Sequence, residues 1–183
     1  MFSGARASLR WYVLPLIVAL SLPVFSFPAS ATDNIGAKWH WAFGYVYYRV
    51  AAYTLPANFQ PAIDNAATKW TNQTAIDLIK GADIGNTNWS DESTHIVWYG
   101  SFPSSWGCPS SLIGCTFVQG TDTVNRHLLD VDTVYKSGEN YTNTCPWLPG
   151  APYDIETVAL HEFGHWGTMN ESNDSGAVMW GSY

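Results

Sequence analysis

The residues with the clearest chemical potential lie near the C-terminus, in the stretch His161-Glu162-Phe163-Gly164-His165. In a helix, residues four positions apart lie on one face, so the two imidazoles can reach the same zinc ion. The carboxylate between them can take a proton from water that the metal has activated and pass it to a leaving amine. This HExxH spacing predicts a zinc site in which Glu162 is the general base.

A catalytic zinc ion takes three protein ligands and keeps a fourth position for water. Glu171 has the spacing of the third ligand in the longer motif HExxHxxGxxH. Thr168 stands where that motif has its turn glycine, and Gly167 comes one place earlier. If Gly167 makes the turn instead, the register shifts and Asn170 or Asp174 competes for the ligand position. A carboxylate ligand makes the site less positive than a third histidine does, so we expect slower chemistry.

Helices and strands must position these residues, and the sequence predicts several of them. Asp154 is placed to cap a helix that begins at Ile155 and carries the HExxH motif. Apolar residues at helical spacing predict a second helix over about 60–71, with one face on a sheet. Strands are predicted over four segments, namely 45–50, 75–79, 94–99 and 125–135. This order of elements indicates an α+β domain with helices packed on a mixed sheet.

A segment after the HExxH motif is also similar to part of a known family. Ala177-Val178-Met179-Trp180 is similar to the Met-turn of metzincins, which in matrixins has a small residue, an aliphatic residue, methionine and tyrosine. With the HEFGHW stretch and the third-ligand spacing, the likeness covers about 25 residues at the C-terminus. On these residues the chain resembles the metzincin zinc metalloproteases, and within them the bacterial matrixin-like secreted peptidases.

The resemblance implies a role for each matching residue. His161, His165 and Glu171 would bind one catalytic zinc ion, and Glu162 would be the base. Met179 would lie beneath the metal as a hydrophobic floor. The segment from Trp180 to Tyr183 would line the pocket for the substrate residue just after the scissile bond.

The resemblance also implies a fold. It would be a metzincin-like α+β domain, with a mixed twisted sheet, a backing helix, the HExxH helix and then the Met-turn. A strand near 94–99 or near 128–134 would form the sheet edge that pairs with extended substrate. The sequence given stops at Tyr183, whereas matrixins usually continue into a C-terminal helix, so we expect this domain to lack that helix.

The first 31 residues are predicted to be a secretory signal peptide. Arg6 and Arg10 precede an apolar run over 11–27, and Ala29-Ser30-Ala31 supplies a cleavage pattern of small residues. Residues 32–183 then form one secreted, extracellular zinc peptidase domain, and no second apolar run is long enough to span a membrane.

An oxidising compartment allows the cysteines to form disulfides. The three are Cys108, Cys115 and Cys145. The first two bracket a short loop rich in proline, glycine and serine, and we favour pairing them. Cys145 could replace either partner, because the sequence alone does not determine connectivity.

Further metal ligands are less well supported. Three histidines are spread over the predicted strands, a pattern more typical of packed or surface residues than of a second zinc site: His40, His95 and His127. Three aspartates are candidate calcium ligands without an EF-hand pattern, and we expect them on a solvated edge: Asp122, Asp130 and Asp132.

Composition limits the partners. The formal net charge of −7 argues against nucleic-acid binding, which needs a surplus of lysine and arginine. Hydrophobic residues make up 46% and charged residues 13%, which argues against disorder. We expect a monomeric zinc endopeptidase that acts on polypeptides. The alternative is a catalytically weak or inactive secreted binding protein with the metzincin fold, and a zinc hydrolase with another substrate is a third hypothesis.

Overall fold

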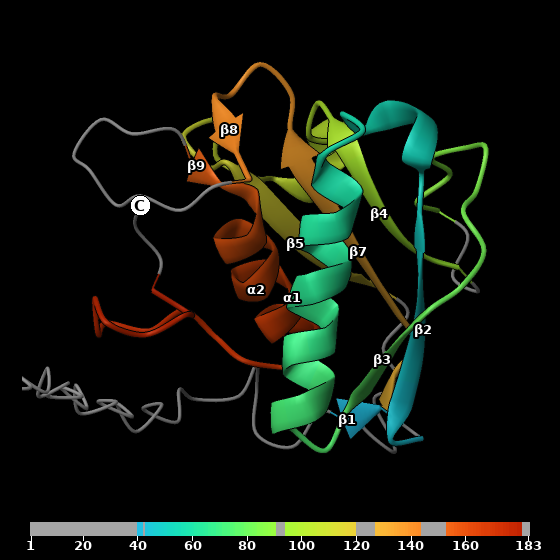
Figure 1. The fold of residues 1–183 in the computed structure, drawn as a ribbon, viewed down its shortest axis with the longest axis vertical. Coiled ribbons are helices and arrows are strands. Elements are labelled where there is room, and N and C mark those ends of the chain that lie inside the picture. The colour runs from blue at the N-terminus through green and yellow to red at the C-terminus, as the bar shows by residue number, and fades with distance from the viewer. Residues whose placement is uncertain (1–39, 42, 91–93, 120–126, 144–152, 181–183) are drawn as a thin grey trace, which may run out of the picture.

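A five-stranded mixed sheet forms the centre of the protein. The computed structural model describes residues 40–41, 43–90, 94–119, 127–143 and 153–180. The sheet has the order β3-β2-β4-β7-β5, in which β5 alone runs antiparallel to its neighbour (Figure 1). Its strands are β2 (Tyr45–Val50), β3 (Asp77–Lys80), β4 (His95–Gly100), β5 (Gly114–Gln119) and β7 (Asp130–Lys136). The predicted α+β class with a mixed sheet is confirmed.

Two helices pack on the same face of this sheet (Figure 1). Helix α1 (Phe59–Gln73) buries an apolar stripe, made of Phe59, Ala62, Ile63, Ala66 and Ala67. Helix α2 (Ile155–Trp166) lies beside it and carries the HExxH motif. The predicted helix over 60–71 is therefore correct but one residue short at its start and two at its end.

The start of α2 follows the predicted cap. Asp154 has an extended backbone, and its Oδ2 accepts hydrogen bonds from the Thr157 amide at 2.9 Å and the Thr157 hydroxyl at 2.6 Å. A side-chain acceptor at this position satisfies an amide that has no partner inside the helix. Glu156 also pairs with Lys69, which ties the first turn of α2 to α1.

The opposite face of the sheet is covered by a second apolar cluster. Ile96, Trp98 and Val134 project from the sheet, and Trp106 packs over them from a short 3-10 helix, Ser104–Trp106. A disulfide joins Cys108 to Cys115, which confirms the favoured pairing. Cys145 lies outside the described residues. The central strands are therefore buried on both faces, as is usual for parallel strands.

The edge strand was predicted incorrectly. β4 and β7 are interior strands, and the edge beside α2 is β5, which begins at the end of the loop between Cys108 and Cys115, where no strand was predicted. The β5 segment was missed because Pro, Gly and Ser around the disulfide favoured a loop prediction. An apolar pattern shows that a strand is buried, but it does not say which strands flank it.

Short elements complete the fold. The predicted strand over 125–135 is two strands, since β6 (His127–Leu128) precedes β7 and pairs with β1 (His40–Trp41). β8 (Tyr141–Thr142) pairs with β9 (Tyr153–Asp154), directly before α2, and a 3-10 turn at Ala52–Thr54 follows β2. No helix in the described part of the chain is both long and apolar enough to cross a membrane.

The disulfide is expected to stabilise the fold measurably. Closing a loop of this length restricts the unfolded chain by about 2–3 kcal/mol. Replacing both Cys108 and Cys115 by serine should lower the free energy of unfolding by about that amount, measured by urea denaturation. Reductant should have the same effect on the parent chain and none on the double variant. Equal stability of parent and variant would contradict this role.

Candidate functional site

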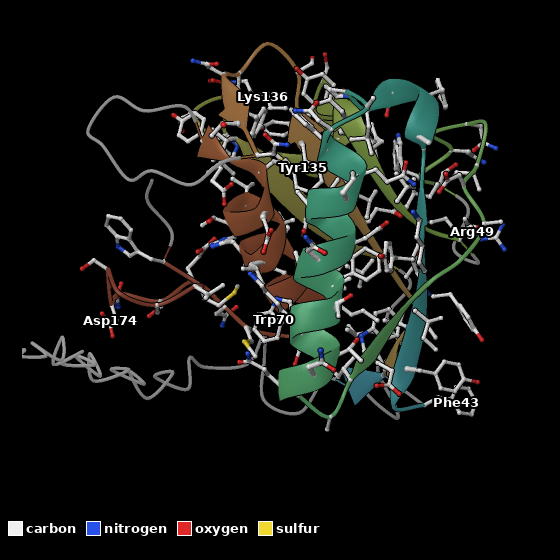
Figure 2. The ribbon with its side chains drawn as sticks, viewed as in Figure 1. Phe43, Arg49, Trp70, Tyr135, Lys136 and Asp174 are labelled. Atoms are coloured by element: carbon white, nitrogen blue, oxygen red, sulfur yellow. A yellow bond between two sulfur atoms is a disulfide. The ribbon has the colours of Figure 1, made fainter. Side chains whose placement is uncertain are left out.

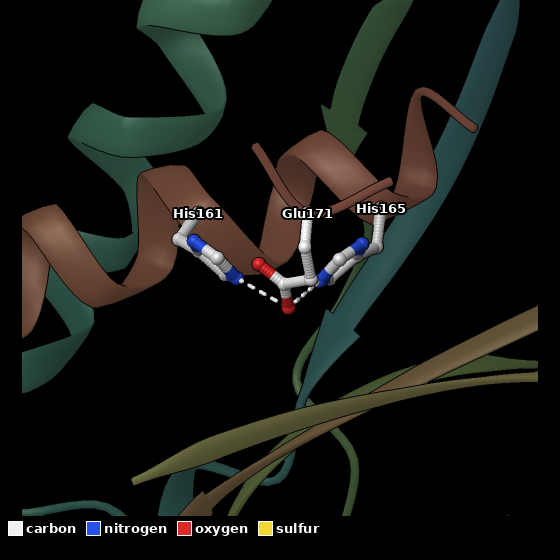
Figure 3. A group of neighbouring side chains, drawn as sticks. All are labelled: His161, His165 and Glu171. Atoms are coloured by element: carbon white, nitrogen blue, oxygen red, sulfur yellow. Dashed lines mark hydrogen bonds and ion pairs between the residues drawn. The ribbon is translucent and has the colours of Figure 1, made fainter. Parts of the chain in front are cut away.

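Three polar side chains converge at one point beside α2. His161 and His165 project from neighbouring turns of the helix, and Glu171 reaches them from the segment that follows (Figure 3). Glu171 Oε1 lies 3.3 Å from His161 Nε2 and 3.5 Å from His165 Nε2. One ligand atom from each of the three residues lies within 4.8 Å of the others, and no second group of this kind occurs among the described residues.

Both imidazoles are oriented by backbone carbonyls. His161 Nδ1 donates to the carbonyl of Val178 at 3.0 Å, and His165 Nδ1 donates to the carbonyl of Met169 at 2.8 Å. A carbonyl only accepts, so the Nδ1 atoms carry protons. In the neutral rings each Nε2 therefore offers a lone pair toward the convergence point, which is the arrangement that metal-binding histidines adopt.

The turn after α2 brings Glu171 into the cluster. Thr168 has φ of 65°, whereas Gly167 has φ of −79°. Threonine itself therefore makes the left-handed turn, at a cost of about 1–2 kcal/mol for a residue with a Cβ. The alternative register, in which Gly167 makes this turn, is wrong.

Of the two alternative third ligands, Asp174 lies away from the cluster. Asp174 is exposed at the outer end of the segment after α2, away from the helix (Figure 2). Its Oδ1 accepts the Gly176 amide at 2.9 Å, so it serves a local turn. Asn170, the other alternative, is exposed and lines the cleft described below.

Met179 lies under the helix rather than in the cleft. The segment after the cluster returns toward α2 through a turn in which the Trp180 amide donates to the Ala177 carbonyl. Met179 is buried, and its sulfur occupies the space beside Gly164 that a side chain there would need. Trp180 forms a bridge with Ser172 and is not part of the cleft lining, and Tyr183 lies outside the described residues.

A cleft of about 520 Å³ opens over the cluster. One wall is α2 with His161, Glu162 and His165, and the other is β5 with the loop that the disulfide closes. The lining is Ser111, Leu112, Ile113, Gly114, Cys115, Thr116, Val118, Tyr153, His161, Glu162, His165, Asn170 and Glu171. The cleft thus combines an apolar strand wall with a polar helix wall, and its described lining holds no lysine or arginine.

Glu162 is a buried carboxylate on the helix wall. Only 4% of its surface is exposed, and its Oε2 accepts a hydrogen bond from the Thr116 hydroxyl at 2.7 Å. Burial raises the pKa of Glu162, although the two histidines and the Thr116 hydroxyl act in the opposite direction. The pKa of Glu162 therefore lies above that of an exposed carboxyl group.

The pKa of the other carboxyl group, Glu171, is shifted in the opposite direction. Burial tends to raise the pKa of Glu171, but hydrogen bonds and charge from His161 and His165 lower it to about 2. Burial alone would lower the pKa of His165, but hydrogen bonding to Glu171 and the charge of Glu162 raise it overall. The pKa values of two carboxyl groups that line the same cleft are thus shifted in opposite directions, and Glu171 stays ionised.

The remaining metal candidates have structural partners. Asp130 and Asp132 lie on β7 and are fully buried, so the expected solvated edge is wrong. Asp130 Oδ1 pairs with His95 Nδ1 at 2.6 Å, and Asp132 Oδ1 accepts the Ile96 amide at 2.7 Å. Asp122 and the side chains of His40 and His127 lie outside the described part of the chain.

Two residues of β5 belong to the site although the sequence analysis did not single them out. Thr116 contacts the Glu162 carboxylate, and Gly114 lies so close to Glu162 Oε1 that any side chain there would displace it. Neither residue type is distinctive by itself. Recognising them requires knowing that β5 is a strand and that it faces α2.

Gly164→Ala is expected to destabilise the protein by about 1–3 kcal/mol, because the added methyl group overlaps with the Met179 sulfur inside a packed core. Alanine favours helices over glycine by up to about 1 kcal/mol, so the clash must exceed that gain. Denaturant unfolding measures the difference. The matched control is Gly85→Ala, whose added methyl group meets nothing within 4 Å. Equal or higher stability of Gly164→Ala would contradict this packing.

No family model matches the sequence, and no curated protein sequence matches it either.

Proposed function

We propose that this chain is a secreted zinc-dependent endopeptidase of the metzincin type. The observation that carries the proposal is the convergence of His161, His165 and Glu171 next to the buried carboxylate of Glu162, in one cleft. Cation ligands and a proton acceptor in contact with the same space are what hydrolysis by metal-activated water requires.

The donor set fits zinc in both chemistry and spacing. Two imidazole nitrogens and one carboxylate oxygen form a known catalytic zinc set. With zinc–ligand bonds of about 2.0–2.2 Å, tetrahedral geometry separates ligand atoms by about 3.4 Å. The separations from Glu171 Oε1 to the two Nε2 atoms are 3.3 and 3.5 Å. With neutral imidazoles, the Nε2 lone pairs of His161 and His165 face the ionised carboxylate of Glu171 and repel it. A bound cation would remove this repulsion.

Glu162 is proposed to move the proton. Zinc, when bound, would supply the Lewis acid that makes water a nucleophile at neutral pH. The Glu162 carboxylate takes a proton from the attacking water and later delivers it to the leaving nitrogen. Its raised pKa brings the carboxyl group closer to working pH, where one group can both accept and release a proton. The ionised Glu171 stays available as a ligand.

The wall opposite α2 supports a peptide as substrate. β5 is an edge strand that pairs only with β7 among the described strands, so its other edge faces the cleft. An extended peptide can add to such an edge through main-chain hydrogen bonds. The apolar side chains of Leu112, Ile113 and Val118 line the same wall and provide contacts for substrate side chains. Export through the signal peptide at 1–31 and a monomeric state complete the proposal.

Zinc binding should depend on Glu171 and not on Asp174. Calorimetric titration of the metal-free chain is expected to give one zinc ion per chain. Glu171→Gln should weaken binding at least about tenfold, because an ionised ligand becomes a neutral amide. Asp174→Asn makes the same chemical change in an exposed turn, so its affinity should stay within about twofold of the parent. A loss in Asp174→Asn with none in Glu171→Gln would reverse the ligand assignment.

Peptide hydrolysis should require both the metal and Glu162. An unfolded protein incubated with the purified chain should be cut, a chelator should stop the cutting, and zinc should restore it. Glu162→Gln should keep zinc affinity but lose about 10²–10⁴-fold in kcat, since the proton acceptor is gone. Full activity of Glu162→Gln would contradict its role. A folded, zinc-loaded parent that cuts no polypeptide would instead favour the binding protein or a different substrate class.

A further inference from the structure

A chain of hydrogen bonds runs from the core to the Glu162 carboxylate. The indole nitrogen of Trp166 donates to the Thr133 hydroxyl at 2.8 Å, and the hydroxyls of Thr133 and Thr116 lie 2.6 Å apart. The Thr116 hydroxyl then reaches Glu162 Oε2 at 2.7 Å. Thr133 and Trp166 are completely buried, so water does not compete for these groups. The chain links α2 to β7, β5 and back to α2.

The groups at the two ends of this series of hydrogen bonds determine which atom donates at each step. An indole N–H can only donate, and an ionised carboxylate can only accept. Thr116 has a single hydroxyl hydrogen. Donating it to Thr133 would leave Thr116 Oγ1 and the carboxylate oxygen as two acceptors facing each other at 2.7 Å, so the hydrogen goes to Glu162 Oε2. Thr133 must therefore donate to Thr116, and its lone pairs receive the indole hydrogen. Each group is satisfied in this one arrangement.

We infer that Thr116 is a positioning residue that assigns different tasks to the two oxygens of Glu162. Oε2 stays an acceptor, held by Thr116, while Oε1 is left to exchange the proton with water and the leaving amine. This inference rests on the proposed function for the proton-transfer step. Its geometric part, that Thr116 holds Glu162 in one rotamer, does not depend on catalysis.

Gly114 completes the arrangement on the same strand. Residues two apart in a strand face the same side, so Gly114 and Thr116 both face Glu162. A side chain at position 114 would overlap with Oε1, whereas the bare Cα leaves room for it. β5 thus offers a hydroxyl to one carboxylate oxygen and, at Gly114, the space that the other oxygen occupies.

In the proposed proton transfer, only the Oε1 atom of Glu162 accepts and releases the proton. An O–H bond of the attacking water breaks, its proton forms an O–H bond at Oε1, and the water oxygen forms a bond to the peptide carbonyl carbon. When the peptide C–N bond breaks, its electron pair goes to nitrogen, which takes that proton from Oε1. The carboxylate is then ionised again, and the Thr116 hydrogen has stayed on Thr116 throughout.

Thr116→Val tests the inference because valine keeps the shape and removes the hydroxyl. In the full chain purified after export, we expect kcat to fall about ten- to a hundredfold with KM within about twofold, since the base loses its orientation while the substrate wall remains. Thr116→Ser should restore most of the kcat. Thr133→Val leaves the Thr116 hydroxyl in place and should lower kcat by a smaller factor. Thr68→Val, on the exposed face of α1, is the control for a lost hydroxyl.

A stability cycle on the metal-free chain tests the contact without activity. Thr116→Val should lower the unfolding midpoint clearly when Glu162 is present, because a buried carboxylate then loses its donor. In a Glu162→Ala background the same substitution should have a much smaller effect. Equal shifts in both backgrounds would mean that Thr116 only packs, which would overturn the inference. An inactive parent chain with strong coupling would contradict the proposed peptidase while leaving Thr116 as the residue that holds Glu162.

Discussion

The Glu162 carboxylate is buried between α2 and β5, and most of the site's architecture follows from that placement. An ionised carboxylate inside a protein is costly unless hydrogen bonds or opposite charges compensate it. Here the compensation comes from the Thr116 hydroxyl on one side and the two histidines on the other. The helix and the strand must therefore keep a fixed separation, and β5 must carry a hydroxyl and a glycine at the right positions.

Helix α2 is held at that depth by contacts along its whole length. Phe163 and Trp166 are buried in the core, and the Phe163 ring packs in a T-shaped contact with Tyr48 from β2. Two indole groups donate to carbonyls of the helix, Trp70 to Leu160 and Trp41 to Trp166, each at 2.7 Å. The second of these carbonyls is at the helix end, where no amide of the helix can reach it. Such anchors allow the opposite face of α2 to present polar groups without shifting.

Predictions from local pattern succeeded where the deciding interaction is local. The cap at Asp154, the helical pairing of His161 with His165 and the short disulfide loop each depend on residues a few positions apart. The edge strand was predicted incorrectly because burial patterns do not encode neighbours. The buried states of Asp130 and Asp132 were missed for the same reason, since their partners come from β4.

The sequence by itself determined the chemistry available to this protein: a helix that presents two imidazoles and a carboxylate, with a second carboxylate ten residues after the first imidazole. Helical periodicity is a short-range property, and it specifies which side chains share a face whatever surrounds them. Only the tertiary structure decided that Thr168 takes the left-handed turn, that Glu171 closes on both histidines, and that β5 lies against Glu162. Those outcomes depend on packing between segments that are distant in the chain, where a strained turn or a buried charge is tolerated because the surrounding core compensates its cost.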